Sequence, residues 1–521
     1  VAVKQTAPGA AGLANISDGL RLSGSMYFTY AEQNRSFQAL GVWIVNVASV
    51  TGLAEPEQVR TVVVSDGALQ ALDVQPKLGR WLSAADQMPG APLTAMLSYG
   101  YWQRRFGGDA SIAGRKITIN GRPWEIVGAM PQGFRFVNAD FDLILPLAFD
   151  RTKLSLPGFG FPGIARLKPG VTIPQANADL ARLLPIWMHS WRFDGNPDIY
   201  KTWKITPALR PLKQEVVGNV SETLWIVMAT IGMVMLIACA NVANLLLVRG
   251  EARQQELAIR AALGAGRGQI ARSFLVECMM LGLMGGALGV GLASAGLRLL
   301  AAIGPSNLPR LSEIAIDPRT LAFSFVLSLL SGLVFGLIPV LKYAGPRIAV
   351  ILRSAGRTLS AGRERHRARN LLVVAQVAMA MVLLVSAGLM IRTFQALRTV
   401  EPGFTKAEHL QTMRISIPPT VAKEPERVAR MQNDINDKLA AIPGVTSVAF
   451  ASAMPMEGIE PNWDCIFAEG TRYVPGEIPP LRMFQYVSPG FFRTAGTRLI
   501  AGRDLTWTDV YAQRHMAMVS E

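Results

Sequence analysis

The stretch TLWIVMATIGMVMLIACANVANLLLV, residues Thr223–Val248, carries no charged side chain over 26 residues. A helix rises about 1.5 Å per residue, so this stretch is long enough to cross the roughly 30 Å hydrocarbon core of a bilayer. Three further uncharged stretches are also long enough: Cys278–Leu297, Thr320–Leu341 and Asn370–Ile391. The sequence therefore predicts a membrane α-helical bundle with four spans, at about 223–248, 276–301, 320–341 and 370–391.

The charged loops between these stretches predict their orientation. Residues 249–273 carry a net charge of +3 and residues 342–369 a net charge of +7, whereas residues 304–319 are neutral. Basic loops stay in the cytoplasm, so the neutral loop and both large flanking regions are expected outside. The Arg-rich segment 347–369 would suit anionic lipid or nucleic acid, or would simply hold the third and fourth spans in orientation; we favour the last.

The composition argues against several other classes of protein. The net charge of +15 is concentrated between apolar stretches, which disfavours a nucleic-acid-binding protein. Three Cys and four scattered His residues give no disulfide framework and no metal spacing. No G-x-x-x-x-G-K-[ST], G-x-S-x-G or H-E-x-x-H motif occurs. We therefore expect no catalytic residues, no metal and no cofactor bound by this chain.

Residues 1–220 predict an α+β domain outside the membrane. A hairpin is expected across Asn120-Gly121, and a capping box joins Thr172 and Gln175 at the start of a helix that should stop before Pro185. The remaining expected elements are a helix at Met26–Leu40 and strands at Gln58–Val64, Leu93–Leu97, Lys116–Ile119, Trp124–Val127 and Ile164–Leu167.

A long-period repeat links the two ends of the chain. Val64-Ser-Asp-Gly67 recurs as Val487-Ser-Pro-Gly490, and Gly79-Arg-Trp-Leu82 as Gly502-Arg-Asp-Leu505, both at an offset of 423, as does Asp86 as Asp509. A helix and then a strand are expected ahead of each copy: Ser36–Leu40 with Trp43–Val47, and Val428–Ala441 with Val445–Phe450. A second copy of the domain is therefore predicted over residues 392–521. We expect the chain to be a fragment at both ends, with about eight spans in the intact protein.

The loop after the first span predicts a short amphipathic helix at the cytoplasmic surface. Glu256 and Arg260 form an i,i+4 pair, and Gly264 and Gly266 are typical of a helix C-terminus. Such a helix would serve either as a docking site for a separate ATPase or as an interfacial elbow between two spans.

Glycines in the second and third spans predict close helix packing. Their spacing offers small-xxx-small surfaces, with ordinary tolerance of glycine in membrane helices as the alternative. The residues expected at such contacts are Gly282, Gly286, Gly332 and Gly336.

Four stretches of the sequence carry a resemblance to a known family. The segment Arg253–Ile270, RQQELAIRAALGAGRGQI, resembles the loop of the FtsX-like permease domain of MacB-type ABC transporters. Gln33–Phe37, Ala165–Val171 and Val487–Phe492 look like parts of the MacB-type periplasmic core domain. The order of segments resembles the duplicated permeases of Acidobacteria. In that pattern, the loop helix faces the ATPase, which implies a coupling role for Arg253, Glu256, Arg260, Gly264 and Arg267.

The resemblance implies five segments: a periplasmic core domain (1–220), an FtsX-like permease domain (221–345), a basic linker (346–369), a fourth span (370–391) and a second, truncated core domain (392–521). It implies a permease subunit for export or efflux of a small molecule, peptide or lipid, energised by ATP on a separate ABC ATPase. The expected place is the bacterial inner membrane, multi-pass, with the large domains in the periplasm. Expected partners are the ATPase, the lipid bilayer and periplasmic proteins, but no nucleic acid. The alternative is a non-transporting sensor or scaffold of the FtsX type, and a tethered periplasmic enzyme is the weakest option.

Overall fold

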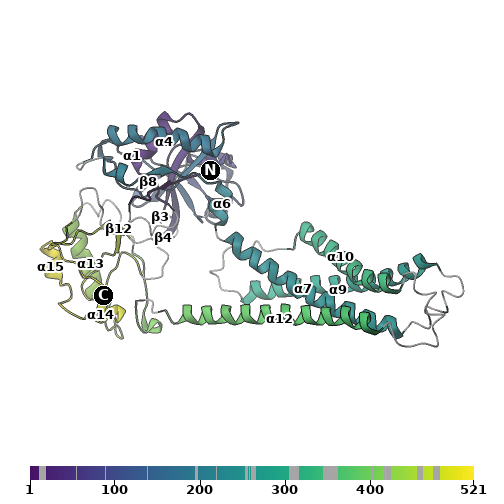
Figure 1. Ribbon diagram of the computed structural model, residues 1–521. Helices are drawn as coiled ribbons and strands as arrows, with labels where there is room; N and C mark the ends of the chain where they lie inside the picture. The colour runs from purple at the N-terminus through teal and green to yellow at the C-terminus, as the bar shows by residue number, and fades with distance from the viewer. Residues whose placement is uncertain are drawn as a thin grey trace. The chain divides into compact units, whose positions relative to one another are not determined.

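The chain forms two compact units, Val1–Gly218 with Glu401–Glu521, and Asn219–Val400 (Figure 1). The structure is a computed structural model. It describes all residues except 11–18, 54, 89, 138, 194–197, 219, 253–255, 257–258, 260–265, 304–315, 344–361, 401–402, 416, 418–423, 455–461, 473–480 and 521.

Residues 1–218 fold around a nine-stranded sheet. Its strands are β1 (Ala2–Val3), β3 (Phe37–Thr51), β4 (Glu57–Val64), β5 (Leu78–Gly79), β6 (Thr94–Leu97), β7 (Lys116–Ile119), β8 (Arg122–Ala129), β9 (Leu143–Pro146) and β10 (Gly163–Leu167). A separate two-stranded sheet pairs β2 (Gln5–Thr6) with β11 (Thr206–Pro207). The helices are α1 (Gly24–Gln33), α2 (Ala68–Leu72), α3 (Tyr99–Phe106), α4 (Ile173–Ser190), α5 (Ile199–Thr202) and α6 (Leu212–Val217).

Six of the strands close into a ring. The pairing runs β3, β4, β9, β6, β8 and β7, and β7 pairs back to β3. One cluster of buried apolar side chains draws on all six strands. Strand alternation explains how: Leu143 and Leu145 join this cluster, while Ile144 between them packs on the other face with Leu69 of α2. The long strand β3 leaves the ring at its first residues, where it pairs with β10 instead.

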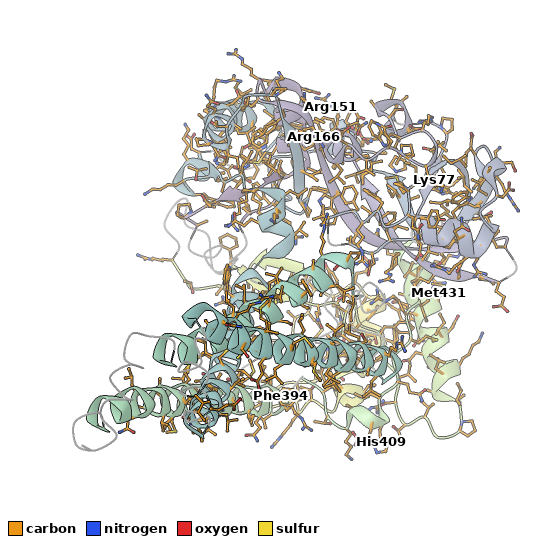
Figure 2. The ribbon with its side chains drawn as sticks, turned by 90° about the vertical axis from the view of Figure 1, so that its right-hand side faces the viewer. Lys77, Arg151, Arg166, Phe394, His409 and Met431 are labelled. Atoms are coloured by element: carbon orange, nitrogen blue, oxygen red, sulfur yellow. The ribbon has the colours of Figure 1, made fainter. Side chains whose placement is uncertain are left out.

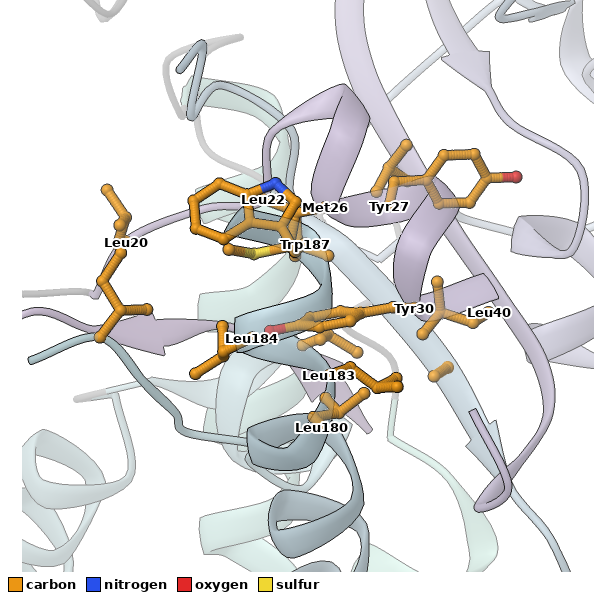
Figure 3. Close-up of a cluster of buried hydrophobic side chains, with 14 of the residues drawn as sticks. Leu20, Leu22, Met26, Tyr27, Tyr30, Leu40, Leu180, Leu183, Leu184 and Trp187 are labelled. Carbon is orange, nitrogen blue, oxygen red and sulfur yellow. The ribbon is translucent and has the colours of Figure 1, made fainter. Parts of the chain in front are cut away.

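Helices α1 and α4 pack together over a second core (Figure 3). Met26 and Tyr30 of α1 are fully buried, as are Leu183 and Trp187 of α4. The indole Nε1 of Trp187 donates to the Ser25 hydroxyl at 2.9 Å, so the buried ring has its polar atom satisfied.

Several sequence predictions for this region are confirmed. All six strands expected in this region are present, with Trp43–Val47 lying within β3. The hairpin turns through Asn120 and Gly121, both with positive φ (51° and 75°), as a type I′ turn requires. The capping box of Thr172 and Gln175 also forms, at the start of α4.

The expected helix Met26–Leu40 is wrong in its second half, and so is the helix expected at Ser36–Leu40. The helix ends at Gln33, and β3 begins at Phe37. Asn34 ends it, because its Nδ2 donates to the Tyr30 oxygen at 2.7 Å while its Oδ1 accepts from the Phe37 N–H at 2.9 Å. A side chain that bonds the backbone on both sides stabilises this exit from the helix.

The expected stop of α4 before Pro185 is also wrong. The helix continues to Ser190. Leu184 precedes the proline, Trp187 and Met188 follow it, and all three belong to the core beneath α1. Burial of these side chains outweighs the backbone hydrogen bond that a proline removes.

Residues 403–520 contain a smaller set of elements: α13 (Pro425–Ala440), α14 (Phe491–Ala495), α15 (Trp507–Tyr511) and the paired strands β12 (Asn462–Cys465) and β13 (Leu481–Phe484). The helix expected at Val428–Ala441 is confirmed as α13. The strand expected at Val445–Phe450 is not formed as a regular strand; the adjacent Ala451 makes an isolated antiparallel bridge to Val487.

The described residues of the second unit form four long helices, α7 (Val220–Ala252), α9 (Arg267–Ile303), α10 (Pro318–Tyr343) and α12 (Gly362–Arg398). Helix α10 packs against α9 and α7, and α7 also contacts α12. Among the described residues, three segments are long and apolar enough to cross a membrane: Leu224–Val242, Ala271–Leu300 and Val373–Arg398. On α10 the apolar segment described is the shorter Pro318–Leu333, so the expected count of four spans is not established by the structure.

Candidate functional site

Helices α9 and α10 meet along a seam of small residues. A methyl group added at Gly282 would lie 2.8 Å from the backbone oxygen of Ser328, and one added at Gly332 would lie 3.0 Å from that of Cys278. A methyl group at Gly286 would run into the Ser328 side chain. These positions have no room for a larger side chain, so the two backbones approach closely because small residues line the seam.

The other glycines of α9 lie differently. Methyl groups added at Gly285, Gly289 or Gly291 would have nothing within 4 Å among the described residues. The seam therefore uses the pair spaced four residues apart, Gly282 and Gly286. Gly336 lies on α10 where its surroundings fall outside the described residues.

Sequence reasoning missed two residues of this seam, Ser328 and Cys278. The Ser328 hydroxyl donates to the Ser324 oxygen at 2.7 Å, so its polar group is satisfied within its own helix. Cys278 is 2% exposed. The signal for Ser328 was available, because it stands four residues before Gly332 in the same small-xxx-small spacing.

The predicted coupling segment lies mostly outside the described residues. Arg253, Arg260 and Gly264 are not described, and Arg267 begins α9. Glu256 is helical and exposed. The role expected for these five residues remains a prediction.

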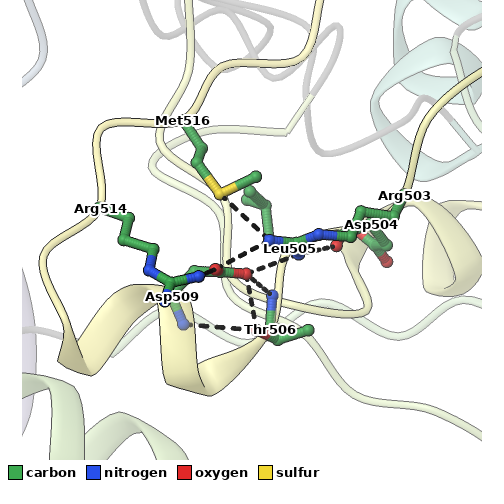
Figure 4. Close-up of polar contacts among 7 residues, drawn as sticks. All are labelled: Arg503, Asp504, Leu505, Thr506, Asp509, Arg514 and Met516. Atoms are coloured by element: carbon green, nitrogen blue, oxygen red, sulfur yellow. Dashed lines mark hydrogen bonds and ion pairs between the residues drawn. The ribbon is translucent and has the colours of Figure 1, made fainter.

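The two copies of the repeat share an ion-pair clasp. In the first, Arg80 donates to both oxygens of Asp86, at 2.7 and 2.9 Å, and Asp86 completes a capping box with Ser83. In the second, Arg503 donates to Asp509 at the same two distances (Figure 4).

The second clasp also has its own capping box and an additional contact. Thr506 takes the place of Ser83, and Arg514 contacts the same carboxylate at 3.3 Å. Because the bonds and spacing recur, the repeat read from sequence is also a repeat in structure.

The clasps depress the pKa values of their carboxyl groups. The Arg80 guanidinium holds the pKa of Asp86 well below its usual range, helped by bonds from Ser83. Arg503 and Thr506 do the same for the pKa of Asp509. Both aspartates are ionised at neutral pH and tie a loop to the start of a short helix. Their role is structural.

A serine is repeated with its contacts as well. The Ser65 hydroxyl accepts from the Val42 N–H at 2.8 Å, and the Ser488 hydroxyl accepts from the Phe450 N–H at 2.8 Å. Each serine N–H in turn donates to the same partner's oxygen, at 2.9 Å in both copies. The glycine two residues on, Gly67 or Gly490, has φ near +80° in each case. The second copy therefore reproduces the turn at the end of β4.

The described surface of residues 1–218 has several open hollows. One hollow of about 420 Å³ is lined by Glu32, Arg151 and Trp191. Arg151 (Figure 2) is already engaged, since it lies 4.5 Å from the Phe28 ring centroid and pairs with Glu32 at 2.6 Å. Within the described part of the chain, no group of three or more His, Cys, Asp or Glu residues is placed to hold a metal ion.

Comparison with known families assigns two parts of the chain. Residues 5–183 match the MacB-like periplasmic core domain, and residues 228–347 match the FtsX-like permease C-terminal domain.

Similar proteins include several transporters. The uncharacterized ABC transporter permease YknZ of Bacillus subtilis is 26% identical over 287 residues, 54% of this chain and 66% of that protein. The pyoverdine export ATP-binding/permease protein PvdT of Pseudomonas syringae pv. tomato is 26% identical over 270 residues, 51% of this chain and 38% of that protein. The macrolide export ATP-binding/permease protein MacB of Escherichia coli K12 is 25% identical over 257 residues, 49% of this chain and 37% of that protein.

Solved structures with a likeness include the periplasmic region of MacB from Actinobacillus actinomycetemcomitans, with a TM-score of 0.28, 16% identity and coverage of 38% of this chain and 90% of that one. The extracellular domain of YknZ from Gram-positive bacteria gives a TM-score of 0.27, 12% identity and coverage of 40% of this chain and 100% of that one.

Proposed function

The chain carries the MacB-like periplasmic core domain and the FtsX-like permease domain of ABC transporter permeases, and from that premise we propose that it is a permease subunit driven by a separate ATPase. ATP hydrolysis on the partner would move the membrane helices, and the helices would rearrange the periplasmic domains. The cargo class is a small molecule, peptide or lipid to be exported. The chain itself binds no cofactor.

The observation that carries this proposal is the length of the helices attached to the extramembrane domains. Helix α7 has 33 residues and α12 has 37, so they extend about 50 and 55 Å. The hydrocarbon core takes up about 30 Å of that length. Helices that continue well beyond the core can carry a displacement from one side of the membrane to the other. All four helices, α10 included, are proposed to span the inner membrane, with both large domains in the periplasm.

Force transmission fits the spans better than an ion pathway does. The uncharged stretches 223–248, 278–297, 320–341 and 370–391 contain no Asp, Glu, Lys or Arg. Proton relays and ion pathways depend on ionisable residues within the membrane. The energy must therefore enter from outside the spans, and we propose that it enters at Arg253, Glu256, Arg260, Gly264 and Arg267.

A photocrosslinking amino acid at position 256 tests this proposal in cells that produce the full chain. Glu256 is exposed and follows α7. Arg298 is also exposed and lies near the C-terminal end of α9, so it serves as the control. We expect a crosslinked product with an ABC ATPase from position 256 and none from position 298. Transport into reconstituted vesicles should then require that ATPase. A crosslink to no ATPase would refute the coupling site and favour a non-transporting sensor.

A further inference from the structure

Two polar side chains in the membrane helices have a buried atom without a hydrogen bond. Among the described residues, Asn244 Oδ1 on α7 and Gln376 Nε2 on α12 are inaccessible to solvent and have no partner. Both lie in uncharged stretches, 223–248 and 370–391. An unsatisfied polar atom is strongly unfavourable in hydrocarbon, so each atom needs a partner when the helices lie in a bilayer.

The two helices that carry these atoms contact each other. Helix α7 packs against α12, and Figure 1 shows them converging toward the Ala252 end of α7 and the Gly362 end of α12. The buried atoms therefore lie in the halves of the two helices that approach each other.

The two residues also lie at similar depth. Asn244 is five residues from Arg249, and Gln376 is seven residues from Arg369, which are the arginines that bound the two uncharged stretches. At about 1.5 Å per residue, these separations are about 7.5 and 10.5 Å from the same membrane surface. A difference of about 3 Å is within the reach of two amide side chains.

The chemistry of the two atoms is complementary, because Asn244 presents a carbonyl acceptor and Gln376 an amide donor. The two atoms are not bonded to each other in the structure. We propose that Asn244 and Gln376 form an interhelical hydrogen bond when the helices lie in a bilayer, and that this bond locks α7 to α12 in its inner half. Helix α7 begins the FtsX-like permease domain, whereas α12 follows the basic linker. The lock therefore joins the first permease domain to the span beyond the linker and makes the two helices move together.

Asn241 is a matched control in the same helix. It carries the same amide one turn earlier and is exposed. If the hydrogen bond is specific to Asn244, changes at Asn241 should not show the same coupling to Gln376.

Disulfide trapping tests the geometry directly. In full-length chain with Cys239, Cys278 and Cys465 replaced, Asn244→Cys with Gln376→Cys should oxidise in native membranes at least tenfold faster than Asn241→Cys with Gln376→Cys. Equal rates, or faster oxidation of the control pair, would overturn the proposal.

A double-mutant cycle tests the bond itself and does not depend on introduced cysteines. Asn244→Leu and Gln376→Leu should be non-additive in the unfolding equilibrium of the chain in micelles, by a factor of about three, as is typical of side-chain hydrogen bonds between membrane helices. The exchange Asn244→Gln with Gln376→Asn should restore the wild-type equilibrium. Additive single changes, or the same coupling between Asn241→Leu and Gln376→Leu, would contradict the lock.

Discussion

Replacing Gly282 with alanine places a methyl group 2.8 Å from the backbone oxygen of Ser328. An ordinary contact begins at 3.4 Å, so α9 and α10 must separate by about 0.6 Å or the backbone must distort. Overpacking of this kind typically costs about 1–3 kcal/mol. Alanine also favours the helix by up to about 1 kcal/mol over glycine, which offsets part of that cost.

Gly285→Ala isolates the packing term. A methyl group at Gly285 has nothing within 4 Å among the described residues, while the gain in helix propensity is the same. The two variants should therefore differ by about 1–3 kcal/mol in unfolding free energy, with Gly282→Ala the less stable. Thermal or SDS-induced unfolding of the purified chain in micelles, followed by circular dichroism, measures this difference. Equal stability of the two variants would refute the close approach of α9 and α10 at this seam.

Three further predictions concern the extramembrane domains. Asp86→Asn should destabilise residues 1–218 by about 1–3 kcal/mol, because it leaves the Arg80 guanidinium and the start of the short helix without their charged partner. Chemical unfolding followed by tryptophan fluorescence measures this change, and an unchanged unfolding midpoint would contradict it. Because the pKa of Asp86 is depressed on folding, its contribution should be constant above about pH 4 and lost as the pH falls further, so melting temperatures should drop less steeply below pH 4 in Asp86→Asn than in the wild type. Ser65→Ala should lower the unfolding free energy by about 1–3 kcal/mol, since the buried Val42 N–H loses its side-chain acceptor, and Ser488→Ala should act in the same direction on the second copy. Proteolysis rates of the two regions measure both effects, and an unchanged rate in either region would contradict the shared turn.

The sequence was most informative where a pattern has one physical solution. An uncharged stretch of more than 20 residues has few alternatives to a membrane span, and Asn120-Gly121 between two strand patterns has few alternatives to a tight hairpin. The repeat was also readable, because Gly67 and Gly490 hold φ values near +80° that few other residues adopt. The coupling segment around Glu256 was readable only by resemblance, and its role is still a prediction.

The sequence was misleading where a local signal competed with burial. Pro185 indicates a helix end, yet α4 continues because Trp187 and Met188 beyond it are buried against the core with α1. Residues Phe37–Leu40 follow a helical pattern, yet they form part of β3, because the pairing with β10 determines their conformation.

Charge, turn chemistry and spacing act locally along the chain, so the sequence alone was enough to predict the long apolar helices, the α+β class of residues 1–218 and the local contacts that recur in residues 450–514. The four-residue spacing of Gly282 and Gly286 predicted a packing surface, but it could not identify the residue across from it. The fold of the helices shows that both glycines meet Ser328 of α10, while Gly285 has nothing within 4 Å among the described residues. The packing of the helices also determines that the Oδ1 atom of Asn244 is inaccessible to solvent, whereas the Asn241 side chain one turn away is exposed. The reason is that a helix presents each residue to a direction fixed by its packing, and packing depends on residues far away in the chain.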